Sequence, residues 1–342
     1  KIFFMNTNLE KINHPEVKYG KTGVLIVNLG TPDSTSWWDI RKYLKEFLSD
    51  RRVIETNPIL WWVILNFIIL NLRPHKTARA YKKIWMKETN ESPLRFYTRS
   101  QSEKLIQKFS SNQNTHVDYA MRYGNPSIRS KMKLMKEQGC EKLIILPLFP
   151  QYAAATTATV CDEVYRNLMT MRWQPSLQII PHYESEPLYI GALANSIENH
   201  LKTIDWIPDV ILSSYHGIPQ KYFDKGDPYQ CYCHKTNRLL IEKFGTKIPI
   251  ELSFQSRFGP ASWLRPYTDK TLERLAKEGK KNILIICPGF SSDCVETLEE
   301  IEMEGQETFR EHGGENFSMV PCLNDSNDHI NLLEYLIKKH IV

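Results

Sequence analysis

Four short apolar runs recur along the chain, and each one ends near a glycine or a proline. The runs are GVLIVNLG from Gly23, KLIILPLFPQY from Lys142, DVILSSYHG from Asp209 and KNILIICPGF from Lys281. A polar stretch that can form a helix follows each run. Short buried strands that alternate with helices are typical of parallel βαβ units. The pattern therefore predicts an α/β protein whose parallel sheets are flanked by helices.

The four runs fall into two similar pairs. The first and third end in a G-T-P or G-I-P turn, and the second and fourth follow helical stretches that end at Gly139 and Gly279. We interpret this as one α/β unit used twice. The predicted first domain spans residues 20–175, and the second spans residues 176–324. The last helix, within residues 325–342, is expected to pack back on the first domain.

One segment departs from the strand pattern. Residues 59–72, ILWWVILNFIILNL, contain no charge and are followed by a basic cluster. The run is too short to span a bilayer, which needs roughly 20 apolar residues. A buried core helix and a helix in the membrane interface both remain open. Trp61 and Trp62 near one end favour the interface, as do the helix-breaking Pro58 and Pro74 that bracket the segment.

Composition narrows the class of protein. At 342 residues, 42% of them hydrophobic and 24% charged, the chain is long enough for two buried cores. The net charge of +5 is spread without a dense basic block, so we expect no nucleic-acid partner. Seven cysteines without regular spacing indicate a reducing compartment, and the first twenty residues hold too short an apolar run for a signal peptide. We expect a cytoplasmic monomer that can bind peripherally to the inner membrane.

A histidine stands where the third apolar run ends. His216 lies between Tyr215 and Gly217, and Pro219 follows two residues later. Ligands collect at the strand tips of open α/β sheets, whereas a histidine inside a core is more often a packed side chain. Position alone leaves both interpretations open.

Acidic residues follow the fourth run. Ser292 or Asp293 can cap a helix, with Glu296 as the capping-box glutamate, which is a purely structural role. Glu296, Glu300 and Glu304 also recur every fourth residue, which places three carboxylates on one helix face. A solvated acidic face is one explanation. The apolar neighbours of these residues favour the other, a path for cations.

His216 and Glu296 form a possible metal site if they face each other across two domains. They would offer one imidazole nitrogen and one or two oxygens to a divalent first-row metal. So few ligands suit a metal that is handed on rather than a structural zinc. Cys231, Cys233 and His234 form a C-x-C-H run that lacks the second pair of a zinc ribbon, so we expect ordinary thiols there.

Several motifs together resemble one family. NLGTP, ESPL, LPLFPQY, SYHGIP, GDPY, FQSRFG, WLRPYTD and CPGFSSDCVETLEEI are similar, in order and spacing, to those of ferrochelatases from about Gly23 to Asn324. The resemblance implies two similar Rossmann-like domains with a porphyrin cleft between them. It implies a lyase that inserts Fe2+, a substrate, into protoporphyrin IX to form protohaem, the last step of haem synthesis.

The resemblance also assigns residues. The catalytic histidine of the family falls on His216 and its key glutamate on Glu296, both of them candidate metal ligands, and Gly217 is expected to let the macrocycle approach the backbone. Glu300 and Asp293 match acidic positions of a polar path. The residues matched to the lining of the cleft are Leu29, Tyr81, Ser92, Arg122, Tyr123, Trp263 and Phe290.

Two departures and one absence qualify the resemblance. Phe149 stands where some members have tyrosine, and Cys294 where some have histidine. Some relatives bind a [2Fe-2S] cluster through a cysteine after the P-Q-Y motif and others near the C-terminus. Here Ala154 follows that motif, and no cysteine follows Cys322. We therefore expect no [2Fe-2S] cluster.

Two rival functions remain beside insertion of iron into protoporphyrin. One is a chelatase for another tetrapyrrole or metal, such as coproporphyrin or cobalt. The other is a non-catalytic haem-binding protein in which His216 is only an axial ligand. The acidic series that begins at Glu296 favours an enzyme, because a carrier has no need to deliver metal or remove protons.

Overall fold

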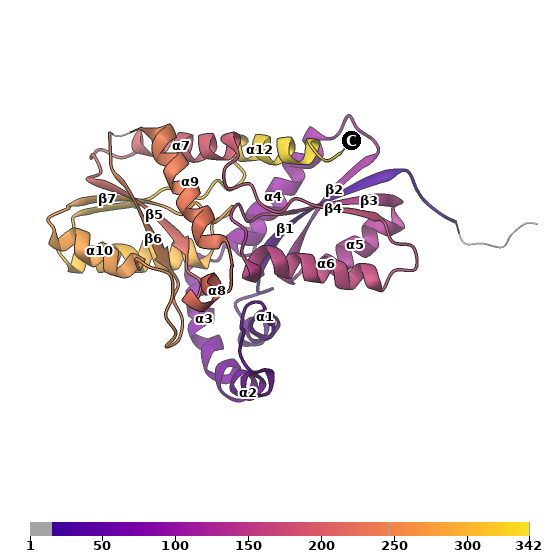
Figure 1. Ribbon diagram of the computed structural model, residues 1–342, viewed down its shortest axis with the longest axis horizontal. Coiled ribbons are helices and arrows are strands. Elements are labelled where there is room, and N and C mark those ends of the chain that lie inside the picture. The colour runs from indigo at the N-terminus through magenta and orange to yellow at the C-terminus, as the bar shows by residue number, and fades with distance from the viewer. Residues whose placement is uncertain (1–15, 246, 342) are drawn as a thin grey trace, which may run out of the picture.

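Two parallel sheets organise the chain in the computed structural model, which describes residues 16–245 and 247–341 (Figure 1). The first sheet has the spatial order β2 (Thr115–Gly124), β1 (Lys21–Thr31), β3 (Cys140–Pro147) and β4 (Ser176–Ile179). The second has the order β6 (Ile250–Gln255), β5 (Val210–His216), β7 (Asn282–Ile286) and β8 (Asn316–Met319). All neighbouring strands run parallel, and the order is the same in both sheets. The prediction of one α/β unit used twice is confirmed. Residues 1–15, most of the stretch on which the expectation about a signal peptide rests, lie outside this description.

The four apolar runs are the inner strands of the two sheets, β1, β3, β5 and β7. Inner parallel strands are buried on both faces, so they show continuous apolar sequence. The edge strands are only partly buried and carry no such run. In β4, Leu177 pairs with Leu143 and Ile179 with Ile145. The first sheet therefore extends past residue 175, where the domain boundary was expected.

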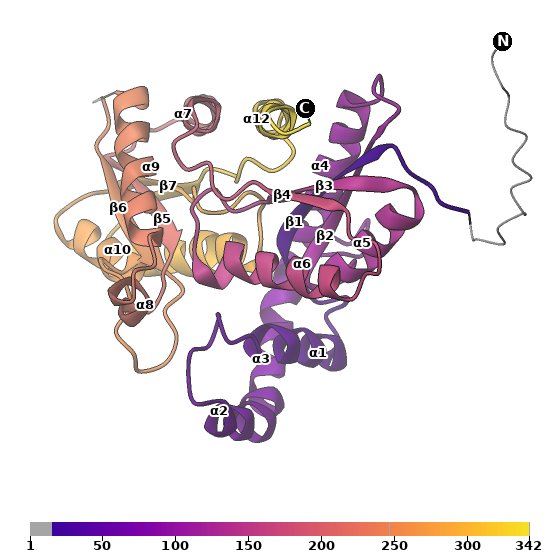
Figure 2. The same ribbon diagram turned by 45° about the vertical axis from the view of Figure 1, so that its right-hand side comes forward.

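Helices cover both faces of the sheets. The first half contains α1 (Trp37–Leu48), α2 (Pro58–Ile64), α3 (Leu70–Ile84), α4 (Pro93–Lys108), α5 (Ile128–Glu137) and α6 (Thr159–Met169). The second contains α7 (Pro187–Leu201), α8 (Gln220–Asp224), α9 (Tyr229–Phe244), α10 (Thr268–Lys277), α11 (Gln306–Glu311) and α12 (Asn327–Lys338). Three π-helical segments are η1 (Leu65–Ile69), η2 (Ala154–Ala158) and η3 (Glu296–Gly305). Both views show α7 and α12 along one side of the sheets, α5, α6 and α10 on the other, and α1 to α3 protruding below (Figures 1 and 2).

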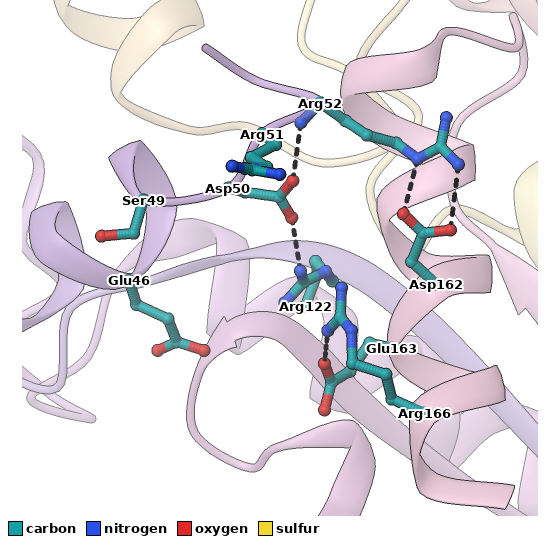
Figure 3. A pocket seen from close by; sticks show the side chains of 9 residues that line it. All are labelled: Glu46, Ser49, Asp50, Arg51, Arg52, Arg122, Asp162, Glu163 and Arg166. Carbon is teal, nitrogen blue, oxygen red and sulfur yellow. Dashed lines mark hydrogen bonds and ion pairs between the residues drawn. The ribbon is translucent and has the colours of Figure 1, made fainter. Parts of the chain in front are cut away.

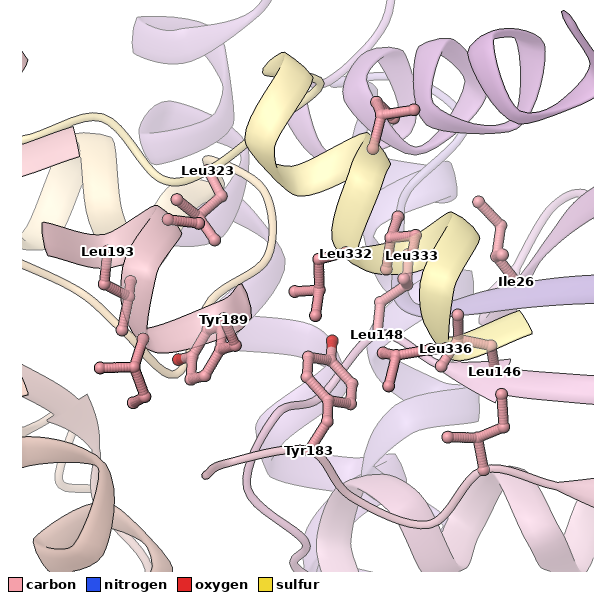
Figure 4. Close-up of a cluster of buried hydrophobic side chains, with 14 of the residues drawn as sticks. Ile26, Leu146, Leu148, Tyr183, Tyr189, Leu193, Leu323, Leu332, Leu333 and Leu336 are labelled. Carbon is pink, nitrogen blue, oxygen red and sulfur yellow. The ribbon is translucent and has the colours of Figure 1, made fainter. Parts of the chain in front are cut away.

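One hydrophobic core joins the two halves (Figure 4). It contains Ile26 and Leu146 of the first sheet, Leu284 of the second, Leu193 of α7 and Leu332 of α12, all of them buried. Burial of each such side chain stabilises the fold by about 1.5–3 kcal/mol. The last helix, α12, packs on α4 of the first half and also on α7. It therefore covers the same face of both sheets.

The apolar segment, residues 59–72, runs through α2, η1 and the start of α3. Leu65 and Leu70 are buried against α1, whereas most of the remaining apolar side chains are exposed. Pro74 does not end the helix, contrary to expectation: it lies inside α3, which continues to Ile84. A proline removes one backbone donor, and here packing of the buried face holds the helix on both sides of it. Among the described residues no helix has both the length and the apolar character to cross a bilayer.

Candidate functional site

His216 is the last residue of β5, an inner strand. In the sheet, β5 lies between β6 and β7, so the strand order reverses direction at β5. Open α/β sheets bind ligands at such a switch point, beyond the carboxyl ends of the strands. The tip of β5 is therefore a position where a ligand is expected. The side chain is half-buried, and its Nδ1 lies 2.6 Å from the Gly217 carbonyl oxygen. A neutral ring that donates its Nδ1 proton to this carbonyl keeps Nε2 as a proton acceptor.

Gly217 makes room for neighbouring protein atoms. A Cβ atom there would lie 3.0 Å from the Gln255 carbonyl oxygen and 3.3 Å from Cε3 of Trp263. This packing alone requires a small residue here, and close approach of the macrocycle to the Gly217 backbone stays a prediction. Trp263 is fixed beside it, because its Nε1 donates to the Phe258 carbonyl over 2.9 Å and the next residue donates to Ile218.

The acidic series lies on η3, a π-helix that begins at Glu296. The expected capping box is absent from this terminus, since the N-cap is Val295 and makes no side-chain bond. Instead the Thr297 hydroxyl accepts the Cys294 N–H over 3.0 Å and lies 3.2 Å from an Asp293 oxygen. π-Helical turns are rare and occur often at functional sites.

The three carboxylates of this series on η3 become more exposed from Glu296 to Glu304. Glu296 and Glu300 are half-buried, whereas Glu304 is exposed. Burial raises the pKa of Glu300; hydrogen bonds from Ser256 and the nearby His216 lower it, and the charge of Glu296 raises it further. Ser256 donates its N–H to one Glu300 oxygen over 2.7 Å and its hydroxyl to the other over 2.5 Å. The structure thus brings His216, Glu296 and Glu300 within electrostatic range of one another.

The first half contributes residues to the same place. Burial strongly raises the pKa of Tyr81 on α3, and the charge of Glu296 raises it further. Burial lowers the pKa of Arg73 on the same helix, and Glu296 opposes this effect. The Arg73 guanidinium also lies 4.5 Å from the centre of the exposed Phe258 ring. Helix α3 therefore faces Glu296 with a phenol and a guanidinium.

Apolar side chains surround these polar groups. The Phe290 ring centre lies 6.4 Å from that of His216. Leu29, at the end of β1, and Leu298, on η3, both pack on the buried cluster that contains Tyr81. The neighbouring Asn28 and Ser291 side chains are 3.5 Å apart. The tip of β1 in the first sheet therefore meets the segment that follows β7 in the second.

Comparison with known proteins identifies the family. Residues 21–341 match the family model described as Ferrochelatase. The chain belongs to the ferrochelatase family. It is 56% identical over 329 residues to a ferrochelatase of Allorhizobium ampelinum, covering 96% of each chain, and 55% identical over 330 residues to one of Agrobacterium fabrum, again covering 96% of each. This membership confirms the predicted enzyme class, an iron-inserting lyase.

Solved structures with a similar fold are distant in sequence. SirB from Bacillus subtilis with Fe3+ is 12% identical with a TM-score of 0.53, covering 93% of this chain and 95% of that one. A sirohydrochlorin chelatase SirB in complex with cobalt is 10% identical with a TM-score of 0.51, covering 93% and 94%. These likenesses confirm the predicted fold alone.

Four residues that the resemblance assigned are held in protein contacts. Ser92 is buried and caps α4 by accepting the Arg95 N–H over 3.3 Å. Asp293 is buried and accepts a 2.6 Å hydrogen bond from Asn324. Tyr123 has no exposed surface, and Arg122 is likewise buried. All four therefore stabilise the frame around the site.

Arg122 lines a charged cavity of about 510 Å³ (Figure 3). Its guanidinium lies 2.5 Å from Asp50, which also accepts the Tyr123 hydroxyl over 3.0 Å. Figure 3 shows two further pairs, Arg52 with Asp162 and Arg166 with Glu163. The full lining is Glu46, Ser49, Asp50, Arg51, Arg52, Arg122, Asp162, Glu163 and Arg166. Neither His216 nor Glu296 belongs to it.

Potential metal ligands are sparse in the described part of the chain. Within it, no group of three or more His, Cys, Asp or Glu side chains is arranged to hold a metal ion. Cys231 is exposed on α9 and Cys233 is buried, and both are free thiols. His216 on β5 and Glu296 on η3 both belong to the second half of the chain, so they do not face each other across two domains as expected, and their role as metal ligands stays a prediction.

Sequence reasoning assigned no role to Gln255 and Ser256, although both lie in the FQSRFG motif. Both stand at the end of β6, in the run IELSFQS, and Gln255 pairs with His216 in the sheet. Identification of β6 as a strand parallel to β5 would have placed them beside the histidine.

Proposed function

We propose that the chain inserts Fe2+ into protoporphyrin IX and releases two protons, which yields protohaem. Membership in the ferrochelatase family supports this reaction. The observation that carries the assignment to residues is the convergence of His216, Glu296 and Glu300 at the switch point of the second sheet. The porphyrin would bind between the two halves, against Leu29, Tyr81, Trp263 and Phe290.

Metallation requires that two pyrrole N–H protons leave while iron sheds water. An imidazole exchanges protons near neutral pH, and Nε2 of His216 is left as an acceptor by the bond from Nδ1 to Gly217. His216 and Glu296 would together hold the incoming iron briefly, through a nitrogen and a carboxylate oxygen. The raised pKa of Glu300 lets that carboxyl carry a proton outward, toward the exposed Glu304.

The rival functions differ in what they require of this series. A non-catalytic haem-binding protein needs one axial ligand and gains nothing from two partly buried carboxylates beside it. A chelatase for coproporphyrin or for cobalt would use the same His216 and Glu296. The partly buried Glu300 therefore favours an enzyme, and the substrate pair is decided by assay.

The test is turnover under anaerobic Fe2+ with protoporphyrin and coproporphyrin in parallel. We expect His216→Ala to lose nearly all turnover while it still binds porphyrin, and Glu296→Gln to be similarly impaired. Two controls should retain activity. His312→Ala removes another histidine whose Nδ1 is bonded to a backbone carbonyl, and Glu302→Gln removes an exposed carboxylate of η3. Turnover by His216→Ala above about a tenth of wild type, a barrier change under roughly 1.4 kcal/mol, would contradict the assignment.

We also propose that the apolar segment, residues 59–72, binds the surface of the inner membrane from the cytoplasm. Protoporphyrin is flat and apolar, so an enzyme gains by taking it from the bilayer. The exposed face of this segment supports the proposal: Ile59, Leu60, Trp62 and Phe67 are more than half exposed. Exposed Trp, Phe and Leu side chains are those that interfacial helices insert at the boundary between headgroups and acyl chains.

Three further expectations are kept as proposals. We propose that no [2Fe-2S] cluster binds, since Ala154 stands after the P-Q-Y motif in the run where cluster-binding relatives have a cysteine. Absorption bands of such a cluster in the purified protein would contradict this. We propose a monomer, to be checked by light scattering. We place the domain boundary after Ile179, because β4 belongs to the first sheet.

A further inference from the structure

Ser256 has an unusual backbone conformation for a residue with a side chain. It follows β6, and its φ of 65° lies in the left-handed region, where few residues other than glycine occur. Such conformations persist when surrounding contacts fix them, and they cluster at functional sites. The contacts here are the two hydrogen bonds to Glu300, 2.7 Å from the backbone N–H and 2.5 Å from the hydroxyl. Ser256 therefore donates a hydrogen bond to each carboxylate oxygen of Glu300.

The residue before it contacts the same π-helix. Gln255 is buried, and its Nε2 donates to the Glu296 carbonyl oxygen over 2.7 Å. Its own Oε1 accepts the Ser214 hydroxyl over 2.7 Å, which fixes the amide orientation. The end of β6 therefore contacts η3 at Glu296 and again at Glu300, four residues later.

The two hydrogen bonds to Ser256 restrict the orientation of the Glu300 carboxylate. The charged or titratable groups that act on it are His216 from β5, Glu296 on its own helix and Cys287 after β7. Fixing a glutamate side chain costs about 1.5–2 kcal/mol in rotamer entropy, which the two hydrogen bonds to Ser256 offset. Proton transfer needs donor and acceptor within hydrogen-bond reach, so the orientation of Glu300 affects the rate.

We propose that Ser256 is a positioning residue of the reaction, which holds the Glu300 carboxylate toward His216 through its N–H and hydroxyl. The proposal rests on the proposed function, in which Glu300 carries protons away from the histidine. Ser256 itself would touch neither porphyrin nor iron. Its effect on turnover should therefore pass through Glu300 and leave substrate binding unchanged.

The test compares Ser256→Ala with Ser256→Gly in steady-state turnover. Both lose the hydroxyl, but glycine relieves the strained φ and alanine does not. We expect kcat to fall about tenfold in both, as for loss of one charge-assisted hydrogen bond, with the KM values for porphyrin and for Fe2+ unchanged. Ser256→Gly should be at least as thermostable as Ser256→Ala. Ser262→Ala, an exposed serine of the same loop, should retain wild-type turnover.

A double-mutant comparison decides whether Ser256 acts through Glu300. In a Glu300→Gln background, Ser256→Ala should cause no further loss of kcat. A second tenfold loss in that background would overturn the proposal, and so would a rise in either KM with kcat unchanged. Absence of iron insertion by the wild-type protein would instead contradict the proposed function, so the two failures are distinguishable.

Discussion

The exposed face of the apolar segment makes a quantitative prediction about membrane binding. Ile59 is 80% exposed, Trp62 59% and Phe67 65%, although all three are large apolar residues. Full burial of such a side chain is worth about 1.5–3 kcal/mol, so their exposed parts together should contribute about 3–6 kcal/mol when inserted. Replacing all three by serine should lower the coefficient for partition of the protein from water onto membranes at least about a hundredfold.

Stability of the fold should hardly change in this triple variant. The three side chains already face water, and exposed positions usually alter the free energy of unfolding by about 0.5 kcal/mol or less each. Trp61 is different. Its Nε1 donates to the Leu48 carbonyl over 2.7 Å and its ring packs on the cluster beneath α1, so Trp61→Ser should destabilise the protein. Of the two tryptophans that favour the membrane interface in the sequence, only Trp62 is largely exposed.

Cosedimentation with anionic lipid vesicles measures the effect. The control is Met169→Ser with Ile207→Ser, which removes two apolar residues that are 80% and 79% exposed outside the segment. We expect the control to bind vesicles as the wild type does and the triple variant to remain in the supernatant, with unchanged circular dichroism. Vesicle binding by the folded triple variant within threefold of wild type would refute the reasoning.

Two further predictions concern stability. Asp50→Asn should leave the buried Arg122 without a counter-charge and lower the free energy of unfolding, measured by denaturant titration, by about 3–5 kcal/mol. Asp269→Asn, which breaks an exposed ion pair with Arg257, should lower it by under about 1 kcal/mol. Equal losses in the two variants would contradict this prediction. Burial lowers the pKa of His329 from 6.5 to about 4, so its contribution of about 3 kcal/mol is present above pH 6.5 and lost progressively as the pH falls toward 4. His329→Gln should make the free energy of unfolding less dependent on pH between about pH 4 and 6.5. The same dependence in the variant as in the wild type would show that His329 does not cause it.

The sequence was sufficient for the inner strands and the family motifs. Continuous apolar runs identify β1, β3, β5 and β7 because parallel inner strands are buried on both faces. Edge strands lack this signal, so β6 was not predicted, and Ser256 was given no role although the FQSRFG motif contains it. The π-helical form of η3 is not readable from residue spacing, since its i→i+5 register is supported by contacts from elsewhere, such as Gln255 with the Glu296 carbonyl.

Distant contacts also decide which polar residues face the site. Arg122 and Tyr123 stand at a strand tip, as His216 does, and sequence alone gives them the same status. In the structure Asp50, which follows α1, binds both of them and holds them in the frame of the first half. No local sequence pattern indicates the contact of Asp50 with Arg122, because the two residues lie more than seventy positions apart.

One face of the apolar segment belongs to the core, and its other face is free for the membrane contact that we propose. Leu65 and Leu70 bury one face against α1, while Trp62 and Phe67 leave the other in solvent. The helical path continues from the exposed face through η1 into α3, and α3 carries Arg73 and Tyr81 to Glu296. Because one helical path carries both sets of residues, insertion of the exposed face would fix the distance and orientation of the site relative to the bilayer.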